Sequence, residues 1–156
     1  MAETIELDEH DRKLLRIVQN DARLKLETLA RKAGLSTSTA QRRLTRLRDL
    51  GVIAAEVAVL DPKMAGGLLT FLVELELERD RPELLPDLKR WIDRSVHVQQ
   101  AWQVTGHSDC LLVVLAESVE GYDALMEQFM AENRNVRKFT TSVALKTLKR
   151  TPVVPI

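Results

Sequence analysis

The segment of residues 34–53, GLSTSTAQRRLTRLRDLGVI, restricts the fold more than any other part of the chain. Ser36 is placed to cap a helix, because its hydroxyl can accept hydrogen bonds from the free amides of the first turn. The apolar positions of this helix recur at spacings of four and three, at Ala40, Leu44 and Leu47. They lie on one side and pack inward, and Gly51 closes the helix. The segment therefore predicts one capped helix with a single docking face.

Two shorter helices are predicted before it. Asp8 can cap the first, which fades near Asn20. Its apolar stripe comprises Leu14, Leu15, Ile17 and Val18. The second covers residues 26–33 and ends at Gly34, which can take the left-handed conformation of a helix C-terminus. With the small residue Ala30 inside the second helix, this arrangement has the spacing of a helix-turn-helix.

Charge is segregated along a chain whose formal net charge is zero. Between Arg23 and Arg48 there are eight basic residues and one acidic residue, Glu27. Residues 61–156 carry twelve basic and fourteen acidic groups. A partner attracted by the basic segment is therefore not attracted by the rest of the chain.

The third helix is consequently predicted to bind double-stranded DNA, because the N-terminal end of such a helix usually enters the major groove. The side chains suited to base edges are Ser38, Thr39, Gln41 and Arg42. Four other residues are suited to phosphates: Ser36 and Thr37 through their hydroxyls at the helix N-terminus, and Arg43 and Arg46 through their charge. The alternative is a surface helix with ordinary solvated arginines.

The second half of the chain contains a weak internal duplication of strand, helix and strand. The first unit covers residues 68–77, 83–94 and 96–104, and the second covers 110–117, 119–132 and 136–148. Two such units predict a four-stranded antiparallel sheet with both helices on one face, the ferredoxin-like βαββαβ arrangement. A strand over residues 53–60 and a turn at Asp61-Pro62 are expected between the two halves.

The turn VTGHSDCLL, residues 104–112, joins the two repeat units. Gly106 permits a tight turn whose exposed amides could hold a carboxylate, and Asp109 could accept an ammonium group. Such a pair suits an α-amino acid. The alternative is a hairpin turn with solvent-facing His107 and Asp109.

Signatures of enzymes, cofactors and membranes are weak or missing. His10, His97 and His107 are scattered, no metal-ligand spacing occurs, and there is no phosphate-binding glycine loop. The single cysteine, Cys110, has apolar neighbours that indicate a buried thiol. No apolar run approaches a membrane span, and the N-terminus is acidic where a secretory signal would be basic. We therefore expect a cytoplasmic protein that is not an enzyme and needs no cofactor.

Nearly the whole chain resembles the Lrp/AsnC (feast/famine) transcriptional regulators. The matching pieces are LDEHDRKLLRIVQNDAR (7–23), LARKAGLSTSTAQRRLTRLRDLGVI (29–53), LDP (60–62), VTGHSDCLL (104–112) and TLKRTPVVPI (147–156). The resemblance implies an α+β protein with an N-terminal winged helix-turn-helix and a C-terminal ferredoxin-like ligand-sensing domain. It further implies dimerisation through the sheets, assembly into octamers or other higher forms, and effectors, commonly amino acids, bound between dimers.

Carried over to this chain, the effector pocket would use the turn, the following helix and the last strand. Its residues would be Gln103, Thr105, Gly106, His107, Asp109, Val119, Tyr122 and Ser142. Many relatives have an acidic residue where this chain has His107, and the Gly-His turn is similar to that of the asparagine-responsive branch. Residues 133–135 replace a common Pro-Gly turn.

We therefore expect a helix-turn-helix DNA-binding domain over residues 1–53, a strand and linker over 54–67, and an effector-binding and oligomerisation domain over 68–156. The expected function is sequence-specific transcriptional regulation modulated by an amino acid or related metabolite. Two alternatives remain open: a tetrapyrrole (sirohaem-type) decarboxylase built on the same two domains, and a nucleoid-associated protein that compacts DNA.

Overall fold

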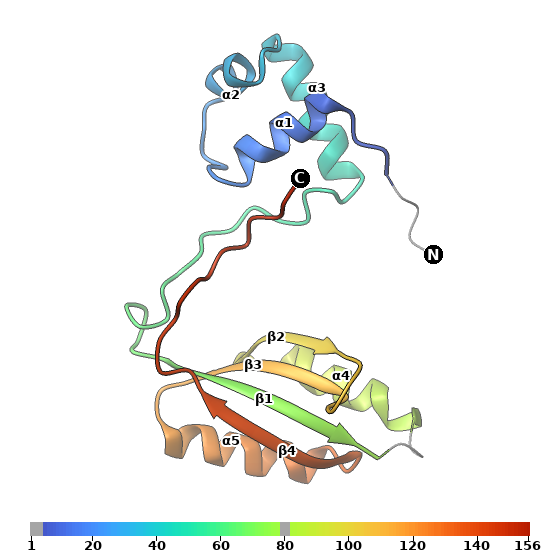
Figure 1. Ribbon diagram of the computed structural model, residues 1–156, viewed down its shortest axis with the longest axis vertical. Coiled ribbons are helices and arrows are strands. Elements are labelled where there is room, and N and C mark those ends of the chain that lie inside the picture. Colours follow the sequence, from blue (N-terminus) through green and yellow to red (C-terminus); the bar gives the residue numbers. More distant parts are fainter. Residues whose placement is uncertain (1–4, 79–81) are drawn as a thin grey trace. The chain divides into compact units, whose positions relative to one another are not determined.

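A computed structural model describes residues 5–78 and 82–156, which divide into two compact units (Figure 1). The helical unit comprises the residues up to 58 together with 149–156. The sheet unit comprises residues 59–148. Among the described residues, no helix is long and apolar enough to cross a membrane.

Three helices form the helical unit: α1 (Glu9–Val18), α2 (Leu26–Ala33) and α3 (Thr37–Asp49). The predicted caps are confirmed, since Asp8 accepts a hydrogen bond from the Asp11 amide and Ser36 from the Thr39 amide. Gly34 and Gly51 follow α2 and α3 with φ of 73° and 70°, which only glycine adopts without strain.

The core of the helical unit is the predicted set of apolar stripes. Leu14 and Leu15 of α1, Leu29 and Ala33 of α2, and Ala40, Leu44 and Leu47 of α3 are all buried in one cluster. Burying each of the leucine side chains contributes roughly 1.5–3 kcal/mol. The apolar face of α3 is therefore fixed inward, and its polar face is left outside.

The sheet unit follows the predicted order of elements. The strands are β1 (Leu69–Leu77), β2 (Val98–Gln103), β3 (Cys110–Ala116) and β4 (Val136–Val143). The helices are α4 (Leu85–Arg94), which follows a 3-10 turn at Pro82–Leu84, and α5 (Val119–Glu132). The strands lie in the order β2-β3-β1-β4 and every neighbouring pair is antiparallel. The predicted ferredoxin-like α+β architecture is confirmed.

Both helices of the sheet unit pack on the same face of the sheet. Phe71, Val73 and Leu75 alternate along β1 and form one buried cluster with side chains of α4 and α5. Trp91 of α4 contacts Phe129 of α5 edge to face, with ring centroids 4.7 Å apart. The opposite face carries the other half of the alternation, including Leu72, which is 47% exposed.

The predicted strand over residues 53–60 is wrong for this chain. Residues 54–60 form no strand among the described residues, so the helical unit has no β-strand wing there. The alternating pattern is present, but a strand requires a hydrogen-bonded neighbour, and no segment of the described chain pairs with this one. Val57, Val59 and Leu60 are accordingly exposed. The last strand also ends earlier than predicted, at Val143 instead of residue 148.

Residues 149–156 belong to the helical unit, although they were predicted to be part of the sheet domain. The Gln19 side chain donates to the Val154 carbonyl (3.1 Å) and accepts from the Val154 amide (3.0 Å). Arg16 Nε donates to the Ile156 carbonyl at 2.6 Å, and the Ile156 side chain packs against the helical core. An extended segment more than 130 residues away along the chain is thus docked on α1.

Candidate nucleic-acid interface and effector site

The N-terminal end of α3 presents a cluster of hydroxyl groups. Ser36 caps the helix, donates to Thr39 Oγ1 at 2.8 Å and lies 3.2 Å from Ser38 Oγ. Ser36, Thr37 and Ser38 are exposed, whereas Thr39 is half-buried and its hydroxyl already has a partner. The exposed hydroxyls and the free amides of the first turn together suit a phosphate group.

Farther along α3, the polar face carries Gln41, Arg42 and Thr45, all of them exposed. Gln41 Nε2 makes a long contact of 3.4 Å to Thr45 Oγ1, which leaves most of its amide free. Within residues 5–78 and 82–156, the Arg42 side chain has no hydrogen bond or ion pair. Gln41 and Arg42 are therefore available for bidentate contacts to base edges.

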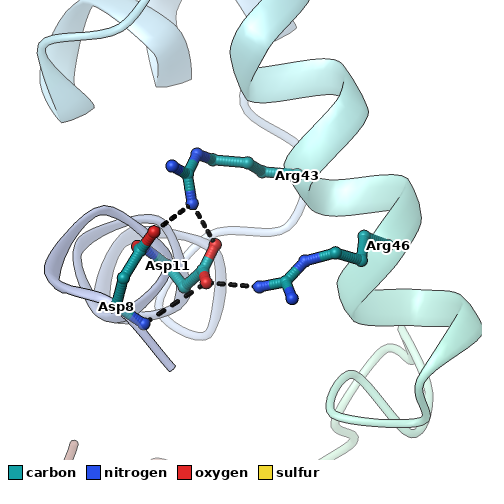
Figure 2. A network of polar contacts seen from close by, with 4 residues as sticks. All are labelled: Asp8, Asp11, Arg43 and Arg46. Carbon is teal, nitrogen blue, oxygen red and sulfur yellow. Dashed lines mark hydrogen bonds and ion pairs between the residues drawn. The ribbon is translucent and has the colours of Figure 1, made fainter. Parts of the chain in front are cut away.

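The other arginines of α3 are held by carboxylates. Arg43 Nη1 donates to Asp8 Oδ2 (2.6 Å) and to Asp11 Oδ1 (2.9 Å), and Arg46 Nη2 donates to Asp11 Oδ2 (2.5 Å), as Figure 2 shows. We call these four residues the ion-pair cluster. Arg48 likewise pairs with Glu56 at 2.7 Å. Much of the positive charge predicted for α3 is thus balanced by acids that lie outside the basic segment of the sequence.

The hydrogen bonds of the cluster favour the charged forms of Asp8 and Arg43. The pKa of Asp8 is lowered, first by the hydrogen bond from the Asp11 amide and then by Arg43. The pKa of Arg43 is raised by its hydrogen bonds to Asp8 and Asp11. A shallow open cavity of about 380 Å³ lies over the cluster, and its lining also includes Glu6 and Arg42. Three carboxylates and three guanidinium groups thus line it.

The sequence-based prediction did not include Asp11. It gave only Asp8 a role, as a helix cap, whereas Asp11 is fully buried and joins α1 to two arginines of α3. The spacing was compatible with this pairing. The two acids, Asp8 and Asp11, lie three residues apart, and so do the two arginines, Arg43 and Arg46. Which faces of the two helices meet is decided by tertiary packing, and the spacing alone does not contain that information.

In the sheet unit, the turn between β2 and β3 is a tight one, with Gly106 at φ 129° and the Val104 amide bonded to the Asp109 carbonyl at 2.9 Å. Asp109 is fixed to the end of β1 by two further bonds. Its amide donates to the Leu75 carbonyl, and its carboxylate accepts from the Leu77 amide, both at 2.8 Å. Asp109 therefore has a structural partner in addition to any ligand.

The remaining predicted effector residues lie at the other end of the sheet. Cys110 of β3 pairs with Leu75 and Ala116 pairs with Leu69, so the turn and the start of α5 are separated by the length of β3, about 20 Å. Ser142 lies opposite Leu72 near that second end. One chain therefore does not bring the predicted pocket residues together.

Tyr122 was predicted to contact the effector, and the structure places its ring in the core. The ring stacks on Phe71, with centroids 4.0 Å apart and planes within 6°. Its hydroxyl lies 2.5 Å from Thr141 Oγ1. Val119, three residues earlier, is exposed on the first turn of α5. Within the described ranges, no group of three or more histidine, cysteine or acidic residues could hold a metal ion.

Comparison with known proteins matches both units. Residues 7–48 match the AsnC-type helix-turn-helix domain, and residues 70–154 match the Lrp/AsnC ligand binding domain. The HTH-type transcriptional regulator y4tD of Sinorhizobium fredii is 41% identical over 152 residues, 97% of this chain and 90% of that protein. The DNA-binding transcriptional activator DecR of Escherichia coli is 31% identical over 150 residues, 96% and 99% of the two chains. A crystal structure of an AsnC family transcriptional regulator from Agrobacterium tumefaciens has a TM-score of 0.89 at 31% identity, covering 96% and 97%.

Proposed function

This chain belongs to the Lrp/AsnC family of transcriptional regulators, and we propose that it reads DNA with the exposed face of α3. The observation that carries this proposal is the exposed end of α3, where hydroxyl groups and Gln41 lie together with Arg42, whose side chain has no partner among the described residues. Ser38, Gln41 and Arg42 contact base edges in the major groove, and Ser36 and Thr37 with the first amides contact phosphate. Thr39 contributes less, because its hydroxyl is already bonded.

Arg43 and Arg46 were both predicted to contact phosphates. Arg46 takes this role only in part, because its side chain is 44% exposed but one of its amino groups is bonded to the buried Asp11 carboxylate. Arg43 is 19% exposed and is bonded to two carboxylates. It acts mainly within the protein, where it joins α3 to α1.

A dimer of the chain has two copies of α3, and the second copy serves as the second recognition helix. The sheet face opposite α4 and α5 exposes Leu72 and Trp102, which are 47% and 49% accessible, beside the half-buried Leu111 and Val113. We propose that this face forms the dimer, with dimers assembling into an octamer. A dimer can meet successive major grooves about 34–36 Å apart.

The DNA contacts are tested with a duplex selected from a random pool by repeated binding to the full chain. Arg42→Ala should weaken binding by about 1–3 kcal/mol and reduce the salt slope by about one. Arg90→Ala, which removes the same charge from α4 of the sheet unit, is the control. Unchanged binding by Arg42→Ala would remove α3 as the reading element. Equal affinity for selected and random duplexes would favour the DNA-compacting alternative.

We propose that the effector is an amino acid or a related metabolite. The turn amides at Gly106 suit its carboxylate, and the free oxygen of Asp109 suits its ammonium group. Because the other predicted residues lie at the far end of the sheet, the site combines the turn of one chain with Val119 and Ser142 of another. To shift the protein's assembly, the ligand must bind one assembly state more tightly than another.

A thermal-shift screen of the common amino acids tests the effector proposal, since a ligand that binds only the folded state raises its melting temperature. His107→Ala should abolish the shift and leave the melting temperature without ligand unchanged, because the His107 side chain is exposed. Trp102→Glu should reduce both the mass measured by light scattering and the shift. If no amino acid stabilises the protein, the proposal that the effector is an amino acid fails while the DNA-binding proposal stands.

A further inference from the structure

All four carboxylate oxygens of the ion-pair cluster are engaged. Asp11 Oδ1 accepts from Arg43, and Asp11 Oδ2 accepts from Arg46 and from the Asp8 amide. Asp8 Oδ1 accepts from the Asp11 amide, and Asp8 Oδ2 accepts from Arg43. The same residues thus cap α1 and hold two cationic side chains of α3 in fixed positions (Figure 2).

The two arginines are held to different degrees. The Arg43 side chain is 19% exposed, and its Nε is buried with no hydrogen-bond partner among the described residues. Moving Arg43 to a DNA phosphate would break both of its ion pairs. Arg46 is 44% exposed and shares only Asp11, whose side chain is 1% exposed. Neither guanidinium can therefore move toward DNA without losing a bond to Asp11.

The charge balance of the cluster affects DNA binding directly. Contacts to phosphates depend on charge and release counterions, and they add the same affinity to every sequence. Contacts to base edges add affinity only to the correct sequence. Two arginines paired with two carboxylates contribute no net charge to the surface of α3. Arg42, which is next to Arg43 in the sequence, has no carboxylate partner among the described residues and is free to reach a base.

We propose that Asp11, assisted by Asp8, is a specificity-determining residue that holds Arg43 back from the DNA backbone and limits the contact of Arg46 with it. The inference rests on the proposed reading of DNA by α3. By limiting binding to random sequence, the two carboxylates increase the share of affinity that comes from base contacts. Asp11 does not touch DNA in this scheme; it acts by positioning the two arginines.

Asp11→Asn tests the proposal, because the amide keeps the size of the carboxylate and one acceptor oxygen but removes the negative charge. The full chain is titrated with the selected duplex and with a random duplex of equal length at several salt concentrations. For random DNA, we expect affinity to rise several-fold and the salt slope to steepen by about 0.9 for each arginine released. The ratio of selected to random affinity should fall by a similar factor.

The matched control is Glu9→Gln, which removes one negative charge from the same turn of α1 at an exposed position. It should change the slope and the ratio much less than Asp11→Asn does. Equal effects of the two variants would overturn the proposal, since charge alone would then explain them. A parallel loss of affinity for both duplexes, with no change in slope, would also overturn it by giving Asp11 a purely structural role.

Asp8→Asn provides a second measurement if the buried substitution prevents folding. Asp8 is half exposed, and its loss frees one of the two bonds of Arg43 without changing a buried position. The same steeper slope and lower ratio are expected at reduced size, and unchanged values would overturn the proposal. The binding proposal is judged separately by Arg42→Ala, so failure of one is distinguishable from failure of the other.

Discussion

The Asp109 carboxylate accepts a hydrogen bond from the Leu77 amide at 2.8 Å, and this bond joins the β2–β3 turn to the end of β1. The residue predicted to bind an effector's ammonium group therefore also stabilises the sheet. Asp109→Ala would remove both functions, and its effect on a ligand response would be ambiguous. We expect it to lower the free energy of unfolding by about 1 kcal/mol, measured by urea denaturation. His107→Ala should leave that free energy nearly unchanged; equal losses would contradict the structural role of Asp109.

Asp8 makes the stability of the helical unit sensitive to acid. Its pKa lies below the ordinary value of 3.8, because the Asp11 amide and then Arg43 bond to its charged form. A carboxyl whose pKa is lowered by folding contributes stability above pH 3.8, and this is lost as pH falls through the folded-state pKa. The difference in melting temperature between the native chain and Asp8→Asn should be full at neutral pH and shrink below 3.8. A difference that persists in strong acid would contradict this assignment.

Tyr122 is the only tyrosine of the chain, so the increase in ultraviolet absorbance that accompanies phenolate formation reports on this residue alone. Burial raises its pKa above the ordinary 10.0, although the hydrogen bond with Thr141 acts in the opposite direction. A raised pKa for this acid means that its contribution to stability is full below pH 10 and is lost as pH rises through the folded-state pKa. Alkaline titration should produce the phenolate at higher pH in the folded protein than in urea. Coincident titrations would argue against a buried ring.

The contact of Gln19 with Val154 predicts protection of an extended segment. The Val154 amide donates to Gln19 Oε1, so its hydrogen exchange should be slower than that of a free amide. Gln19→Ala should accelerate this exchange by removing the acceptor. Gln128→Ala on α5, where the side chain bonds Glu132 and no other described residue, is the matched control. If exchange at Val154 is unchanged in Gln19→Ala, the segment is not held by this pair.

Local signals were sufficient to predict most of the fold. The approximate bounds predicted for α2 and α5 agree with the structure, in which Gly34 ends the first helix and Ser118 caps the second. The alternation of apolar residues along β1 matches its buried face. The strand expected over residues 53–60 was wrong because strand formation requires a partner, which a sequence pattern does not supply.

The candidate site was less predictable, because its chemistry depends on contacts between distant residues. The hydroxyl groups of α3 follow from the cap at Ser36 and could be placed from the sequence. The pairing of Arg43 with Asp8 and Asp11 spans more than 30 residues and depends on the angle between two helices. Tyr122 was placed with the ligand through a family resemblance, whereas its position opposite Phe71 places it in the core.

The docking of residues 149–156 on α1 has a consequence for the order in which the protein is made. The three helices are synthesised first, but Val154 and Ile156, which complete the surface of α1, are synthesised only after the whole sheet unit. N-terminal domains generally fold first during synthesis, yet this one remains unfinished until the ribosome has passed through both repeats. A fragment ending near residue 58 would contain every recognition residue and still lack part of its native packing.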